Sequence, residues 1–178
     1  MKKLLTLIAM AALPLTAAAH GPSPQKVEKE IIIKAEPAKV WALVKDFGGW
    51  QKWHPAVAST KIEVKKDDNG DDATFRTLTL KDGGTIVEKL RSSDDTSMVI
   101  KYEIESGVLP VSDYYSVFSV KPGENAGETK VTWMGRFYRV YKLNPPIPEG
   151  QDDESAIKAV TGMYDSGLAA LKKIAEGK

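Results

Sequence analysis

The sequence predicts an α+β fold in which a curved antiparallel sheet of about seven strands wraps round a long C-terminal helix. Two observations carry this prediction. β-Branched and alternating segments follow one another across short turns, and such short connections join antiparallel neighbours. The last segment, residues 152–176, places its apolar side chains at helical spacing.

The first elements are a strand and a short helix. Residues 27–35 are rich in β-branched side chains and read as a strand. Pro37 opens a helix, where the missing N–H of proline costs nothing, and Gly48-Gly49 ends it. One face of this helix is apolar and carries Val40, Trp41, Leu43, Val44 and Phe47.

A run of six strands separated by turn signals comes next. Asn69-Gly70 is a strong hairpin signal after the first of them, and the residues from Gly107 to Pro110 interrupt the run. A stiff proline-rich linker, residues 144–148, leads to the last helix. The expected strands are residues 57–66, 73–80, 85–91, 97–105, 114–120 and 129–141. The apolar face of the last helix is expected to carry Ile157, Val160, Tyr164, Gly167, Leu168, Leu171 and Ile174.

The N-terminus has the layout of a secretory signal peptide. Lys2 and Lys3 precede an apolar stretch, and Ala17 and Ala19 take the small-residue positions of an A-x-A cleavage site. The stretch is too short and wrongly flanked for a stable membrane span. We therefore expect a signal peptide at residues 1–19, one domain at residues 20–178, and a periplasmic location.

Charge and cysteine content exclude several classes of function. Without Lys2 and Lys3 the chain has 23 basic and 24 acidic residues, so we expect no nucleic-acid partner. It has no cysteine, and hence no disulfide, thiol nucleophile or thiolate metal site. No cofactor motif is recognisable, so we expect no cofactor, and no later segment is apolar enough to span a membrane.

Residues 46–55 form the most informative loop, because Trp50, Trp53, His54 and Pro55 crowd into it. Each aromatic ring can bury a large apolar area, so the loop either plugs a core or forms the rim of a pocket. His54 could serve as a base near neutral pH, but no nucleophile or orienting acid is placed beside it by a motif. Packing against Trp53 is the alternative role for this histidine.

Three segments resemble the helix-grip fold of the START and SRPBCC superfamily, which is also called polyketide-cyclase-like. They are residues 27–35, the helix start at residues 37–41, and the Trp50-x-x-Trp53-His54-Pro55 block, and the resemblance covers nearly all of the mature chain. The aromatic block, the signal peptide and the proline-rich linker together make the chain similar to the MxaD-type periplasmic accessory proteins of methanol oxidation. That resemblance implies methanol dehydrogenase and its cytochrome c as partners.

Three functions follow as hypotheses. The first is a non-enzymatic accessory protein that supports electron transfer in methanol oxidation through protein contact. The second is a periplasmic carrier of a small hydrophobic ligand, which needs an apolar pocket on the order of a few hundred Å3 under the last helix. The third is a cyclase- or aromatase-like enzyme, which the lack of an evident acid–base pair disfavours.

The candidate binding residues come from the loop and from strands. Trp133 shares a strand face with Gly135 and could line a cavity or simply pack in the core, whereas Arg136 lies on the opposite face and could pair an acidic group. We expect the aromatic loop to be exposed and to bind the partner, because tryptophan dominates interface hot spots. The candidates for ligand or partner binding are Trp50, Trp53, His54, Tyr102, Trp133 and Arg136.

We assign no catalytic residue and no metal site. An N-terminal His20 could chelate copper after cleavage, but a second histidine would be needed and His54 lies in a different loop. The acidic residues 67–72 lack the ligand spacing of a calcium loop.

Export gives the first testable prediction. N-terminal sequencing of the protein secreted by a bacterial host should begin at His20, because cleavage follows Ala19. A retained Met1, or tight association with the inner membrane, would contradict the signal-peptide assignment.

Overall fold

The computed structural model describes residues 21–178. The predicted signal peptide, its cleavage site and His20 lie outside the described residues. Among residues 21–178, no helix combines the length and the apolar character that a membrane span requires.

The strands form one seven-stranded antiparallel sheet with the order β1-β7-β6-β5-β4-β3-β2. Strands β2 to β7 follow one another as a meander, and β1 returns to pair with β7 along its whole length. This confirms the predicted sheet. The strands are β1 Gln25–Ile33, β2 Val57–Lys66, β3 Asp72–Leu80, β4 Thr85–Asp94, β5 Val99–Gly107, β6 Val111–Pro122 and β7 Thr129–Arg139.

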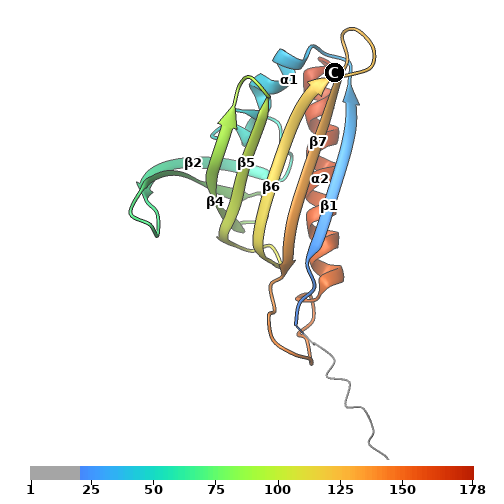
Figure 1. The fold of residues 1–178 in the computed structure, drawn as a ribbon. Helices are drawn as coiled ribbons and strands as arrows, with labels where there is room; N and C mark the ends of the chain where they lie inside the picture. Colours follow the sequence, from blue (N-terminus) through green and yellow to red (C-terminus); the bar gives the residue numbers. More distant parts are fainter. Residues whose placement is uncertain (1–20) are drawn as a thin grey trace, which may run out of the picture.

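The sheet curves round the long helix α2 (Asp153–Ala175), which covers β1 and β7 (Figure 1). Register shifts in β2, β4 and β6 bend the strands locally, as bulges do. The β2–β3 hairpin projects away from the body of the molecule (Figure 1). A curved sheet closed on one long helix is the predicted helix-grip arrangement.

Local chemistry explains the helix boundaries. Helix α1 (Pro37–Val44) begins at the predicted proline, and the short 3-10 helix η1 (Trp50–Lys52) lies in the aromatic loop. Asp152 caps α2, because its side chain accepts a hydrogen bond from the Ser155 N–H at 2.7 Å. The acidic first turn and basic last turn of α2 complement its dipole, as the sequence indicated.

The buried face of α2 differs in part from the prediction. Ile157 and Ile174 are 37% and 40% exposed, whereas Ala156 and Ala175 are buried in their place. Small side chains at both ends let the helix lie close to the sheet, and the larger isoleucines fall at the edges of its apolar stripe. The middle of the predicted face, from Val160 to Leu171, is buried as expected.

Several strand ends also differ from the prediction. Strand β5 begins two residues late because Met98 adopts a positive φ of 50° in the preceding turn. Strand β7 ends at Arg139, two residues early, whereas β4 and β6 are longer than expected.

The two glycines inside α2, Gly162 and Gly167, have different surroundings. A Cβ on Gly167 would lie 2.7 Å from His54 Cδ2 and 2.9 Å from the Trp133 ring, so the helix approaches the core closely there. A Cβ on Gly162 would meet nothing within 4 Å. Glycine inside a helix costs about 1 kcal/mol relative to alanine, so the sequence predicts a close approach at both positions. This prediction is wrong for Gly162, which faces open space.

This difference gives a matched pair of variants on one helix. Gly167→Ala should lower the free energy of unfolding by about 1–3 kcal/mol, because the added methyl overpacks the core. Gly162→Ala should raise it by up to about 1 kcal/mol through helix propensity alone. Urea unfolding measures both, and effects of the same sign would contradict this assignment.

Candidate functional site

The candidate residues of the loop and strands meet in one aromatic cluster between the sheet and α2. The Trp50 ring centroid lies 4.9 Å from that of Trp53, 5.3 Å from Trp133 and 5.6 Å from Tyr102. His54 is stacked parallel to Trp50 at 6.0 Å. The structure thus brings together all the candidates except Arg136.

Contacts within the loop direct its rings inward. The Gly49 N–H donates to the Asp46 carbonyl at 2.9 Å, and a Cβ on Gly49 would overlap the Asp46 carboxylate, so glycine lets that carboxylate fold back over the turn. The His54 N–H then donates to the Trp50 carbonyl at 2.7 Å. This tight turn places both tryptophans on the core side.

The prediction of an exposed aromatic loop is wrong. Trp50 and Trp53 are only 1% and 3% exposed, because the concave side of the curved sheet receives both rings. Their indole N–H groups have no hydrogen-bond acceptor among the described residues, so contacts of the ring faces and edges hold them. The loop plugs the core, which was the first of the two roles considered for it.

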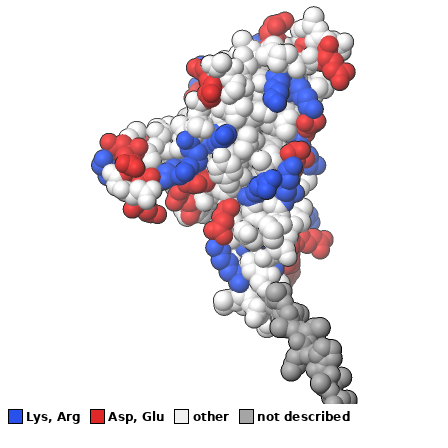
Figure 2. All heavy atoms as spheres, in the orientation of Figure 1, with Lys and Arg blue, Asp and Glu red and all other residues white. Residues whose placement is uncertain are grey.

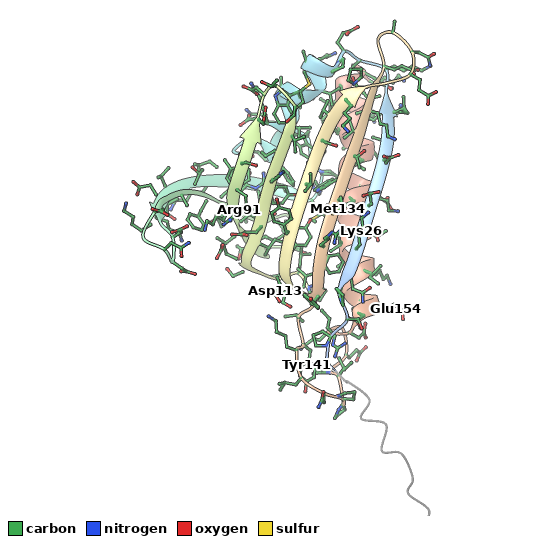
Figure 3. All side chains as sticks on the ribbon, viewed as in Figure 1. Lys26, Arg91, Asp113, Met134, Tyr141 and Glu154 are labelled. Carbon is green, nitrogen blue, oxygen red and sulfur yellow. The ribbon has the colours of Figure 1, made fainter. Side chains whose placement is uncertain are left out.

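Arg136 lies apart from the cluster. It is exposed on the outer face of β7, beside Met134, which Figure 3 labels on the side of the sheet away from α2. Strand alternation predicted this split correctly, since Trp133 and Phe137 are buried on the other face. Any role of Arg136 in binding would therefore be independent of the aromatic cluster.

His54 is held as a neutral side chain. Its Nε2 lies 3.2 Å from the Met163 carbonyl, and its Nδ1 accepts a hydrogen bond from the Ala56 N–H at 3.3 Å. These partners fit the tautomer with the proton on Nε2, which donates to Met163. Burial lowers the pKa of His54 from 6.5 to about 4. These contacts and its burial give it a packing role.

This pKa shift predicts a loss of stability in mild acid. Between pH 6.5 and pH 4 the unfolded chain binds a proton at His54 and the folded protein does not, so the free energy of unfolding falls as pH falls. From pH 7 to pH 4 the wild type should lose about 3 kcal/mol more than His54→Gln. Urea unfolding at both pH values measures this, and equal losses would show that His54 titrates normally.

A buried ion pair adjoins the cluster. Arg76 on β3 and Glu88 on β4 are cross-strand partners, and they are 0% and 2% exposed. The Arg76 Nε–H donates to the Glu88 carboxylate, and Nη1 donates to the Phe47 carbonyl at 3.2 Å. Burial raises the pKa of Glu88, while the charge and hydrogen bond of Arg76 oppose that shift.

Aromatic rings surround the guanidinium of Arg76. Its Cζ lies 3.6 Å from the ring centroid of Trp50, 4.1 Å from Phe47 and 4.9 Å from Tyr102. Such cation–π contacts are worth up to about 2 kcal/mol each when desolvated. Arg76 therefore ties the aromatic loop to strands β3 and β4.

This ion pair was not predicted from the sequence, although the strands carry a signal for it. Counting by twos along β3 puts Arg76 on the same face as the buried Leu78, and counting along β4 puts Glu88 beside the buried Ile86. Two opposite charges on inward-facing positions of adjacent strands indicate a buried pair. Recognising it would have required the strand register.

The pair gives a prediction with an internal control. Arg76→Met should lower the free energy of unfolding by about 3–5 kcal/mol, because Glu88 is left buried without its partner. The double variant Arg76→Met with Glu88→Leu should recover most of this loss. Urea unfolding of the single and double variants measures the coupling, and additive losses would contradict it.

Polar groups next to the cluster satisfy one another. The Trp133 Nε1–H lies 2.9 Å from the Tyr102 hydroxyl and 3.1 Å from the Ser116 hydroxyl, and the Tyr114 and Tyr164 hydroxyls share a hydrogen bond. Burial raises the pKa of all three tyrosines, so they stay protonated. Their arrangement supports packing and provides no general base near neutral pH.

A small apolar cavity remains beside the cluster. Its volume is about 100 Å3, which is smaller than the predicted pocket and below the usual range for ligand sites. Aromatic side chains fill the rest of the space, as shown by the Trp133 and Tyr164 rings stacked at 4.1 Å. The cavity is lined by Trp50, His54, Ala56, Val57, Leu78, Leu80, Ile86, Leu109 and Met163.

Comparison with known proteins agrees with this fold. Residues 24–176 match the family described as polyketide cyclase/dehydrase and lipid transport, and the chain belongs to that family. The family includes cyclase enzymes as well as binding proteins. A search of the curated proteins found no significant match.

Solved structures resemble the chain over most of its length. The protein XoxI from Bacillus cereus is 30% identical, with a TM-score of 0.67 over 84% of this chain and 94% of that one. An uncharacterised protein from Bacillus thuringiensis is 29% identical, with a TM-score of 0.68 over 85% and 98%. A Streptomyces aromatase/cyclase, 16% identical, shares the fold with a TM-score of 0.63 over 86% and 94%.

Proposed function

We propose that this protein is a non-enzymatic periplasmic accessory protein of the MxaD type, which supports methanol oxidation by contacting methanol dehydrogenase or its cytochrome c. The filled interior carries this proposal. A carrier or cyclase needs space for its substrate beneath the last helix, and here aromatic side chains occupy that space. The sequence resemblance supplies the partners.

The buried ionisable groups also favour a role without chemistry. Glu88 is bound to Arg76, and His54 is bound to backbone groups on both sides of its ring. A general acid or base must reach the proton that it transfers, and these groups already have protein partners in a closed core. The outer surface is then the part of the molecule available for function.

Basic and acidic side chains are interspersed on the face of the molecule shown in Figure 2, and the two kinds are nearly equal in number in the whole chain. Long-range steering should therefore be weak, and contact should depend on a local patch. Transient redox encounters have small interfaces, so we expect an affinity on the order of micromolar.

A second candidate function is binding of a small hydrophobic ligand, which the wholly apolar cavity favours. The ligand would have to fit about 100 Å3 or displace a side chain. Native mass spectrometry of protein isolated from periplasmic extract tests this. A retained small molecule would support the carrier function over the accessory one.

The accessory function predicts a change in rate. Added wild-type protein should speed the reduction of cytochrome c by methanol dehydrogenase, with a half-maximal effect on the order of micromolar. Stopped-flow absorbance of the cytochrome measures this, with an equal concentration of serum albumin as the control. An unchanged rate would sink the accessory function.

Substitution of the buried tryptophans is a poor probe of this contact. Trp50→Ala and Trp53→Ala remove fully packed rings and should each cost about 3–5 kcal/mol of stability. A lost rate effect in those variants would report unfolding rather than a lost interface. Surface variants are needed instead.

A further inference from the structure

A surface groove opens where β5 and β6 diverge. Their pairing runs from Val99 and Ser119 to Glu103 and Tyr115 and ends there. Beyond it, residues 104–107 of β5 and 111–114 of β6 lie on either side of a groove of about 710 Å3. Asp113, labelled in Figure 3 at this end of β6, has a positive φ of 50° in the β6 irregularity.

Each wall of the groove presents a strand edge. The β5 stretch remains paired with β4, as at Ile104 and Glu88, and the β6 stretch remains paired with β7, as at Val111 and Arg139. Within the described part of the chain, no ladder joins the two stretches across the groove. Such an edge can accept an added strand through main-chain hydrogen bonds.

The lining of the groove is acidic and apolar. Glu103, Glu105 and Asp113 contribute three carboxylates, whereas Lys142 is the one basic residue of the lining and pairs with Asp113 at 2.9 Å. Arg91, outside the lining, pairs with Glu103 at 3.2 Å, so Glu105 carries the least compensated charge. Burial, and then the charge of Glu103, raise the pKa of Glu105, whereas the charge of Lys89 lowers it. Apolar contact is offered by Ile104, Leu109, Val111 and Val140.

We propose that this groove receives an extended segment of the partner protein in which basic and apolar residues alternate. The inference rests on the proposed accessory function. Alternation suits a strand, because successive side chains point to opposite faces and would meet the carboxylates and the apolar lining in turn. Each wall offers room for about four residues at roughly 3.3 Å per residue.

A peptide titration tests the groove without the natural partner. The probe is acetyl-Lys-Val-Lys-Val-Lys-amide at low ionic strength, followed by amide chemical shifts of the 15N-labelled mature protein. Saturable shifts should be confined mainly to residues 103–107 and 111–115. The same peptide with glutamate in place of lysine should cause no saturable shifts, because the groove repels it.

One pair of charge variants makes the test specific. Ser106→Lys adds a positive charge in the groove and should weaken binding of the basic peptide about tenfold. Ser59→Lys makes the same change at an exposed site on β2 and should leave binding unchanged. Circular dichroism confirms that both variants fold.

The outcomes separate this inference from the accessory function. Absent shifts, equal binding of the glutamate peptide, or equal weakening by both variants would overturn the groove proposal. In the cytochrome assay, an active wild type with an equally active Ser106→Lys variant would also overturn it and leave the accessory function standing. An inactive wild type would overturn the accessory function, whatever the titration shows.

Discussion

The rest of the core depends on the contacts made by the buried guanidinium of Arg76. A charge removed from water is costly unless its hydrogen bonds and its countercharge are replaced. Glu88 supplies the countercharge and binds Nε, and the Phe47 carbonyl accepts a hydrogen bond from Nη1. Nη2 has no hydrogen-bond partner among the described residues, but the faces of Trp50, Phe47 and Tyr102 surround the group. Two of these residues belong to the loop after α1, so the loop can take only a position that satisfies the arginine.

The aromatic loop in turn determines how α2 lies on the sheet. Once Trp50 and His54 fill the concave side, the helix must come close enough to close the core, and it does so where Gly167 has no side chain. Gly135 on β7 serves the same approach from the sheet, because a Cβ there would overlap the Tyr164 hydroxyl. The two glycines and the rings between them leave little free volume.

Much of this fold could be predicted from the sequence, and the errors have a common cause. Strand alternation, turn residues and helical spacing are local signals, and they predicted every strand, the short helix α1, the long helix α2 and the correct face for Trp133 and Arg136. The burial of Trp50, the close approach at Gly167 and the pairing of Arg76 with Glu88 depend on sheet curvature and register. Curvature and register depend on how strands distant in sequence pair, so they cannot be predicted from any single segment.

The same fold can enclose a ligand or exclude one, and the difference lies in a few side chains. Where a helix-grip protein holds a substrate, the space beneath the last helix must stay open, and here stacked rings such as Trp133 and Tyr164 fill it. Filling that space stabilises the domain, but the interior can then no longer bind a ligand or a partner directly. Recognition must then rely on the convex face of the sheet and its edges. Adjacent strands separate at the groove between β5 and β6, and there unpaired backbone, acidic side chains and apolar surface coincide. A filled core and a divided outer surface support the proposed contact with another protein.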